Sequence, residues 1–131
     1  MRILLDTHTF LWSLSAPERL PKNARTAIED KQNQVFVSAV TFWEIAIKLR
    51  LGKLDLGSSD DIVDGAVTAG FTPIPLTPDE AASSSDLAEA THNDPFDRLL
   101  IWQAITRDLT IVSGDPEFEL FRQDGLKLLW K

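Results

Sequence analysis

The chain of 131 residues contains no cysteine, which excludes disulfide bonds and thiolate metal sites. It also lacks any run near the roughly 18 consecutive apolar residues that a membrane-spanning helix needs. The apolar stretch Ile3-Leu4-Leu5 at the N-terminus is far too short for a signal peptide. No linker, internal repeat or low-complexity segment divides the sequence. These absences predict one domain over residues 1–131, located in the cytoplasm and without a membrane partner.

Basic residues are also scarce. Against 20 Asp and Glu the chain has 13 Lys and Arg, which gives a formal net charge of -7 and a pI near 4.7. Such a protein does not hold nucleic acid by bulk electrostatic attraction. An enzyme that acts on nucleic acid is not excluded, because a bound metal ion reverses the sign of the charge locally. The hydrophobic share of 44% is ordinary for a globular protein with a real core.

Short apolar runs alternate with helical patterns along the chain. The expected strands cover residues 2–5, 34–38, 71–76, 109–113 and 127–130, and the third is a short or edge strand because its two prolines cannot donate to a ladder. The expected helices cover residues 10–14 (capped by Thr9), 21–31, 42–49 (begun by Ser38 or Thr41), 60–69 (closed by Gly70), 78–90, 95–107 and a short turn from Asp115. This order predicts an α/β protein, a three-layer α/β/α sandwich around a mostly parallel sheet.

The stretch Asp94-Pro95-Phe96-Asp97 has the pattern of a helix start. Asp94 takes the N-cap position, Pro95 the first helical position and Asp97 the third. Both carboxylates then lie beside the free N–H groups and the positive end of the helix dipole. Taken alone, this pattern favours two acids that cap a helix.

Three further acids change that interpretation. In a parallel α/β sheet, the carboxyl ends of the strands and the N-termini of the following helices share one edge, where ligands bind. Acids from four separate segments map to that edge: Asp6, Glu44, Asp94 with Asp97, and Asp115. A chance gathering of all of them is a poor explanation.

Clustered carboxylates need a counter-ion. Two ionised carboxylates ~5 Å apart repel by about 3 kcal/mol at an effective dielectric of ~20. Oxygen ligands without cysteine favour a hard cation, Mg²⁺ or Mn²⁺, rather than zinc. Such ions lower the pKa of bound water and neutralise charge on a phosphoryl group. The pattern therefore predicts hydrolysis of a phosphodiester.

Three stretches, Leu4-Leu5-Asp6-Thr7-His8, Trp43-Glu44-Ile45-Ala46-Ile47-Lys48 and His92 to Leu100, resemble the PIN-domain ribonucleases, specifically the VapC-type toxins of bacterial toxin–antitoxin pairs. The resemblance spans essentially the whole chain. It implies an acidic site formed by Asp6, Glu44, Asp97 and Asp115, with Asp94 as a further acid at its rim. It also implies Mg²⁺ dependence, cleavage of RNA, a homodimer and inhibition by a cognate antitoxin protein.

Other polar residues near these stretches have two interpretations each. Ser113, which ends a strand just before Asp115, adds a hydroxyl to the site. Lys48 and the basic residues after it contact RNA phosphates or form a solvated helix end. Arg98 contacts substrate phosphate or pairs with a site carboxylate. His8 and His92 act as a general base or, as we prefer, hydrogen-bond near a helix start.

The four tryptophans, Trp12, Trp43, Trp102 and Trp130, are candidates for stacking on nucleobases. Trp43 and Trp102 fall beside apolar helical positions, which favours core or dimer contacts for these two. Among competing functions, a phosphatase with a strand-end aspartate nucleophile would carry a second aspartate where His8 stands. The alternative left open is a catalytically weak PIN-like module that binds nucleic acid or protein.

Overall fold

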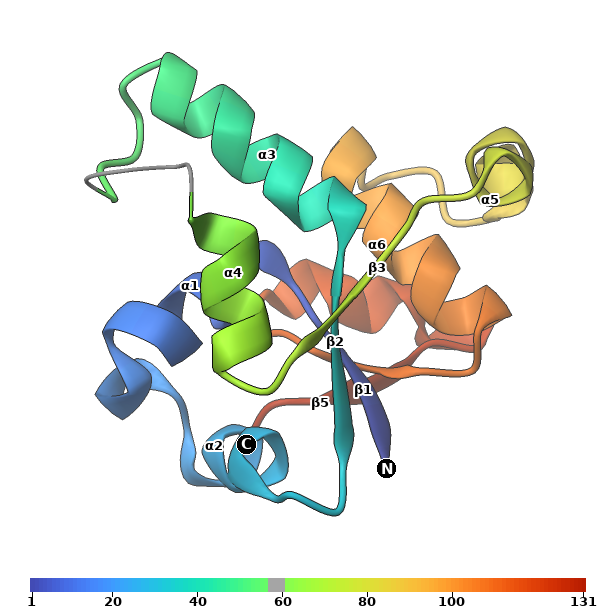
Figure 1. The fold of residues 1–131 in the computed structure, drawn as a ribbon. Coiled ribbons are helices and arrows are strands. Elements are labelled where there is room, and N and C mark those ends of the chain that lie inside the picture. Colours follow the sequence, from blue (N-terminus) through green and yellow to red (C-terminus); the bar gives the residue numbers. More distant parts are fainter. Residues whose placement is uncertain (57–60) are drawn as a thin grey trace.

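The computed structural model describes residues 1–56 and 61–131 and contains a five-stranded sheet in the order β3-β2-β1-β4-β5 (Figure 1). Every neighbouring pair of strands is parallel. The strands are β1 (Arg2–Leu5), β2 (Gln34–Ser38), β3 (Thr72–Ile74), β4 (Thr110–Val112) and β5 (Lys127–Leu129). The predicted α/β class and parallel sheet are confirmed.

Helices cover both faces of this sheet (Figure 1). The α-helices are α1 (Thr7–Ser15), α2 (Lys22–Glu29), α3 (Ala39–Arg50), α4 (Ile62–Thr68), α5 (Pro78–Ser83) and α6 (Pro95–Thr106), and the 3₁₀ helices are η1 (Pro17–Arg19), η2 (Ser84–Asp86) and η3 (Pro116–Asp124). Side chains of α1, α2, α3 and α4 build the core on one face, and those of α6 and η3 dominate the core on the other. The three predicted layers are thus present.

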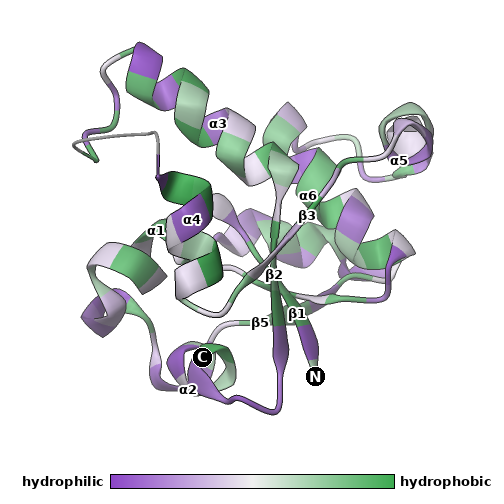
Figure 2. Cartoon of the chain, in the orientation of Figure 1, coloured by the Kyte–Doolittle hydropathy of each residue, from purple (hydrophilic) through white to green (hydrophobic). Residues whose placement is uncertain are grey.

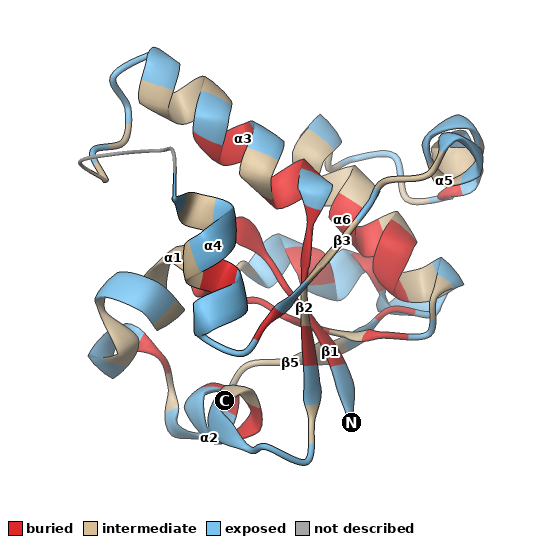
Figure 3. Ribbon diagram, viewed as in Figure 1, coloured by how far each residue is buried: buried red, intermediate tan, exposed pale blue. Residues whose placement is uncertain are grey.

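Strand β1 is apolar after its first residue because it is covered on both faces of the sheet. Ile3 and Leu5 pack into the core on one face of the sheet, whereas Leu4 packs into the core on the other. All three are fully buried. Figure 2 shows the resulting apolar centre, and Figure 3 shows that the same strands are buried. A strand covered on both faces reads as a continuous apolar run.

The strand order reverses between β1 and β4, which makes this the switch point of the sheet. The chain moves outward from β1 to β2 and β3, and then crosses to the other side of β1 for β4 and β5. Ligands in open α/β sheets bind at such a switch point, outside the carboxyl ends of the strands. Asp6 directly follows β1, and Ser113 directly follows β4. The Asp6 amide donates to the Val112 carbonyl (3.2 Å), which joins the two strand ends.

Several element boundaries shift by a few residues from the prediction, and two helices show differences with a clear cause. Helix α1 begins at Thr7 and is capped by Asp6, not by Thr9, whose hydroxyl donates to the Val112 carbonyl (3.0 Å). The helix expected over 78–90 ends as an α-helix at Ser83 and continues only as the short η2. The expected start of the 60–69 helix lies outside the described residues. Within the described parts of the chain, no helix is long and apolar enough to cross a membrane.

Candidate functional site

Asp6 lies at the switch point of the sheet, directly after β1. Its residue is only 5% exposed, and its carboxylate accepts the Thr9 amide (2.8 Å) as the N-cap of α1. Burial raises the pKa of Asp6, although hydrogen bonds from Ser113 and Thr9 oppose the rise. Burial therefore outweighs both these hydrogen bonds and the nearby charge of His8, which also favours the ionised form.

Glu44, in the second turn of α3, has both carboxylate oxygens engaged. Its Oε1 accepts the Thr7 hydroxyl (2.7 Å), and its Oε2 pairs with the Lys48 ammonium (2.8 Å). Glu44 is 6% exposed. Since Thr7 is the neighbour of Asp6 in the chain, this hydrogen bond fixes the position of Glu44 relative to the first acid. Lys48, predicted as a phosphate contact, lies directly on a site carboxylate.

Asp97 lies near Glu44, in the first turn of α6. The helix begins as predicted, because the Asp94 carboxylate accepts the amides of Phe96 and Asp97 (2.9 and 3.1 Å). Burial raises the pKa of Asp97 to about 6, and the charges of Asp94 and Glu44 add to the rise. A hydrogen bond with His92 opposes it. The pKa of Asp97 is therefore raised in part by two other acids of the predicted set.

His92 lies between two carboxylates. Its Nε2 contacts Asp97 Oδ2 (3.0 Å), and its Nδ1 contacts Glu117 Oε2. Ionised carboxylates only accept hydrogen bonds, so both ring nitrogens donate in the charged imidazolium form. Burial by itself would lower the pKa of His92, but the hydrogen bond with Asp97 and the surrounding acids raise it overall. The expected hydrogen-bonding role near a helix start is confirmed.

Ser113 connects Asp6 to Asp115. The serine is buried, hydrogen-bonds with Asp6 and accepts the amide of Asp115 on its Oγ (3.1 Å). Asp115 caps η3 by accepting the Glu117 amide (2.9 Å). His92, Asp115 and Glu117 each offer a ligand atom within 4.8 Å of the others, the one such group among the described residues. Both nitrogens of His92 are already engaged by Asp97 and Glu117, so we interpret this trio as a network of hydrogen bonds and ion pairs beside the other acids.

Contacts therefore bring four of the five predicted acids into one cluster, which we call the acid cluster. It consists of Asp6, Glu44, Asp97 and Asp115. Asp94 is exposed at the rim, and its described contacts are those of a helix cap. Its predicted role as a metal ligand stays a prediction.

Arg98 is engaged mainly by backbone groups. Its guanidinium donates to three backbone carbonyls, those of Leu87 (3.1 Å), Glu89 (2.5 Å) and His92 (3.0 Å). It also lies over the Phe121 ring, 6.0 Å from the centroid. Arg98 thus holds the loop before α6 in place, and no site carboxylate is among its described partners. Its predicted contact with substrate phosphate stays a prediction.

Sequence reasoning missed Thr7 and Glu117. The signal for Thr7 was its position at the first turn of α1, beside Asp6, where a short hydroxyl can reach a neighbouring helix. The pair of Glu44 with Lys48 follows the four-residue spacing typical of helical ion pairs. Glu117 gave no signal, because its partner His92 is distant in sequence.

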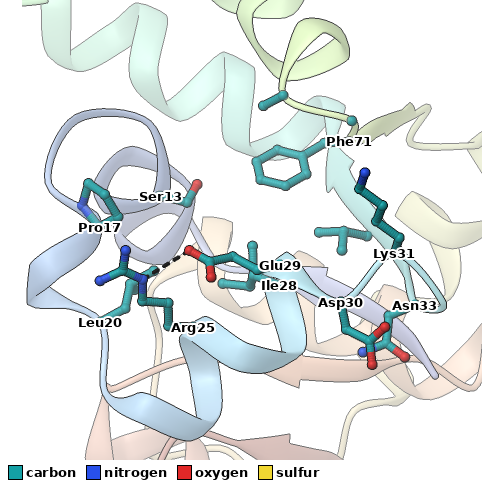
Figure 4. A pocket seen from close by; sticks show the side chains of 13 residues that line it. Ser13, Pro17, Leu20, Arg25, Ile28, Glu29, Asp30, Lys31, Asn33 and Phe71 are labelled. Carbon is teal, nitrogen blue, oxygen red and sulfur yellow. Dashed lines mark hydrogen bonds and ion pairs between the residues drawn. The ribbon is translucent and has the colours of Figure 1, made fainter.

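A separate cavity lies away from the acid cluster. It measures about 480 Å³ and opens between the end of α1, α2 and the turn after α4 (Figure 4). Apolar side chains of Leu20, Ile28 and Phe71 line it, and the Arg25–Glu29 ion pair (2.9 Å) lies at its margin. None of the acid cluster lines this cavity, so it is a separate surface feature.

Comparisons with known proteins agree with this geometry. A family model described as the PIN domain matches residues 3–123. Ribonuclease VapC22 of Mycobacterium tuberculosis is 27% identical over 133 residues, with 98% of each chain covered. Among solved structures, the DNA-bound VapBC complex from Salmonella typhimurium matches with a TM-score of 0.72 at 18% identity, covering 98% of this chain and 97% of that one. VapBC2 from Rickettsia felis, bound to a promoter fragment, gives 0.71 at 18% identity over the full length of both chains.

Proposed function

The chain belongs to the PIN-domain family, and from that premise we propose that it is a divalent-metal-dependent endoribonuclease, the toxin of a toxin–antitoxin pair. One observation carries the proposal: acids from four segments converge at the switch point of a parallel sheet, where Asp6 and Asp97 have raised pKa values. RNA is the proposed substrate because a relative that matches over 98% of the chain is a ribonuclease.

The acid cluster fits Mg²⁺ or Mn²⁺. Its donors are carboxylate oxygens, the ligands that hard cations prefer. Burial and neighbouring acids raise the pKa of Asp97 even though it hydrogen-bonds with His92, so the positive charge of a metal ion would stabilise its ionised form. Asp6, Glu44, Asp97 and Asp115 are the residues that would hold the ion. When bound, the ion would activate a water molecule and offset the charge on the phosphoryl group.

The other residues of the site position these acids. Thr7 donates to the Glu44 carboxylate, and Ser113 hydrogen-bonds with the Asp6 carboxylate and accepts the backbone amide of Asp115. His92 contacts the Asp97 carboxylate. We keep Lys48 as the proposed phosphate contact, because its side chain is 33% exposed and its ammonium has donors beyond the one that Glu44 engages.

Cleavage of RNA by the purified protein tests the proposal. We expect cleavage with Mg²⁺ or Mn²⁺ and none with EDTA. Asp6→Asn should abolish cleavage and leave the fold intact, because asparagine is as good an N-cap as aspartate. Asp64→Asn, at an exposed acid in the first turn of α4, is the matched control and should cleave normally. Cleavage by Asp6→Asn at the wild-type rate would remove Asp6 from the site, and the absence of cleavage by the wild type would favour a binding module.

We also propose that a cognate antitoxin inhibits the enzyme by placing a basic side chain in the acid cluster and covering an apolar groove. The solved relatives are complexes of VapB with VapC. The cavity of Figure 4 has an apolar floor suited to the second contact. A complex whose partner approaches neither the acid cluster nor this cavity would contradict the assignment.

A homodimer in the cytoplasm completes the proposal. Trp43 on α3 is 56% exposed and contacts the Phe96 ring edge-on, with centroids 5.1 Å apart. The core position considered for Trp43 is therefore wrong, and the dimer contact is the proposed role. Trp102, by contrast, is half-buried and donates to Ser83 Oγ (2.9 Å), in agreement with a packing role. Light scattering on the wild type and on Trp43→Ala measures the oligomeric state.

A further inference from the structure

A row of aromatic rings lies beside the acid cluster. His8 and Trp12 are one turn apart on α1, with ring centroids 6.3 Å apart. Trp12 in turn contacts Trp130, which follows β5, at a centroid distance of 6.2 Å. We call His8, Trp12 and Trp130 the ring row. None of the three side chains was assigned a role in holding or positioning the acids.

Both ends of the ring row meet the acid cluster. At one end, His8 belongs to the helix turn that Asp6 caps. At the other end, the Trp130 indole lies against Gly114, where an added Cβ would come within 2.6 Å of the ring. Gly114 stands between Ser113 and Asp115, so the loop that carries two site residues packs directly under an aromatic ring. The ring row is therefore continuous with the acids.

The rings remain accessible. His8 is exposed, and Trp12 and Trp130 are half-buried. Trp130 also lines a cavity of about 410 Å³ that includes Ser113, Gly114 and Lys131. Aromatic side chains that serve only as core are covered on all sides, as Phe10 and Phe118 are.

Positive charge accompanies the rings, although the chain as a whole carries -7. The Arg19 guanidinium lies over Trp12, 4.5 Å from the ring. Lys131 and Arg122 line the cavity beside Trp130. Arg122 pairs with Glu119, which leaves Arg19 and Lys131 as the cations best placed for a phosphate. Rings with interleaved cations are the combination that binds single-stranded nucleic acid.

We propose that the ring row is a stacking site for a nucleobase of single-stranded RNA next to the phosphate held at the acid cluster. This inference rests on the proposed function, because it identifies where the substrate of that reaction lies. The base stacks on the exposed faces of the ring row, while Arg19 and Lys131 approach the flanking phosphates. The subsite tolerates different bases because every base has a stacking face.

Paired substitutions test the inference with a 5′-fluorescein-labelled single-stranded RNA of mixed sequence and about 12 nucleotides. His8→Ala and Trp12→Leu remove a ring, whereas His8→Phe and Trp12→Phe keep one. Leu14→Ala, at an exposed apolar residue of the same helix, is the control. We expect ring removal to raise KM about 5- to 100-fold, with kcat changed much less. The phenylalanine variants and Leu14→Ala should stay near the wild type.

An abasic probe makes the test independent of folding effects. After the cleaved bond of the probe is mapped, the base on each side of it is removed in turn. In the wild type, one of these abasic probes should raise KM as much as ring removal does. In Trp12→Leu, and in His8→Ala, whose residue is exposed, the same abasic probe should cause no further rise in KM.

Each outcome decides the inference separately from the proposed function. If the wild type cleaves RNA and ring removal leaves KM unchanged, or if the abasic and ring effects add, the inference is overturned and the nuclease assignment stands. If the wild type cleaves no RNA, the nuclease assignment fails. Fluorescence anisotropy with the same probe then decides: affinity that falls with ring removal supports the subsite, and unchanged affinity overturns it.

Discussion

Asp97 and Glu80 are both largely buried acids, yet their surroundings shift their pKa values in opposite directions. Hydrogen bonds from Arg107 lower the pKa of Glu80 to about 2. Burial and the nearby charges of Asp94 and Glu44 raise the pKa of Asp97 to about 6. Glu80 has a cation in contact and serves the fold. Asp97 has other acids beside it, the arrangement found where a site awaits a positively charged ligand.

The raised pKa values predict how the stability of the metal-free protein depends on pH. A folded state that binds protons more tightly than the unfolded chain loses stability as pH rises. The stabilising contribution of Asp97 is lost between pH 3.8 and about pH 6. The pKa of Asp6 is raised in the same direction. The contribution of His92 is lost as pH rises above 6.5 through its raised folded-state pKa. Thermal melts in EDTA should therefore give a lower Tm at about pH 8 than at about pH 5. A Tm that rises over this range would contradict the burial of unpaired acids.

Asp97→Asn is the matched variant for this measurement. It removes the charge and keeps a hydrogen-bond acceptor for His92, so in EDTA above pH 6 it should melt higher than the wild type and show a weaker pH dependence. The gain is about 1–3 kcal/mol, since one pKa unit corresponds to about 1.4 kcal/mol. A helix-cap role alone predicts the opposite, a loss of about 0.3–1 kcal/mol. Mg²⁺ should stabilise the wild type more than the variant.

At the scale of elements, α5 is joined to α6 by a polar network around Glu80. Thr77 and Glu80 form a capping box at the start of α5, and Glu80 also pairs with Arg107 (2.6 Å) and accepts from Gln103 (3.2 Å). Gln103 is fully buried and accepts the Ser38 hydroxyl (2.5 Å), which connects the network to β2. The α5–α6 packing thus depends on one ion pair of low exposure.

Glu80→Gln should destabilise the protein by about 1–3 kcal/mol, because it leaves the partly buried Arg107 without its charged partner. Glu119→Gln is the matched control, since its pair with Arg122 is about half exposed on both sides (58% and 49%) and should change stability by less than about 0.5 kcal/mol. Urea unfolding measures both free energies. Equal effects of the two substitutions would show that Glu80 is not a structural acid.

The sequence predicted the central elements better than the peripheral ones. β1 and β2 were predicted with their observed bounds, because strands buried on both faces must be apolar throughout. The start of α6 followed from its cap Asp94, and of the two caps considered for α3, Ser38 and Thr41, the structure has Ser38. The end of α5 could not be predicted, because Arg98 binds the carbonyls of residues 87, 89 and 92 and so stabilises a non-helical loop. That contact depends on α6 being in place.

For the site, topology carried the prediction. Parallel strands end at one edge of the sheet, and this rule alone predicted that Asp6 and Asp115 lie close together. The same rule added Glu44 and Asp97, which stand near the starts of helices. Their partners were beyond sequence reasoning, because the contact of His92 with Glu117 and that of Gly114 with Trp130 depend on how η3 and β5 pack. No local pattern encodes such packing.

At the scale of the whole molecule, the net charge of -7 limits how RNA is held. Binding that depends on a metal ion and a few cations near the ring row neutralises few phosphates. The logarithm of RNA affinity should therefore fall with the logarithm of salt concentration with a slope that corresponds to about one to three phosphate contacts. The KM for RNA cleavage, measured at several salt concentrations in constant Mg²⁺, gives the slope. A slope that corresponds to about six or more phosphate contacts would indicate an extended basic surface and contradict this prediction.

The most direct test of the central claim is the rate of RNA cleavage as a function of Mn²⁺ concentration for the wild type, Asp97→Asn and Asp64→Asn. The acid cluster predicts a saturable rise in rate for the wild type and for Asp64→Asn, whose exposed acid lies outside the cluster. Asp97→Asn should remain folded and show almost no metal-dependent cleavage. Cleavage by Asp97→Asn with the wild-type rate and metal dependence would contradict the claim that these acids form the metal site of a nuclease.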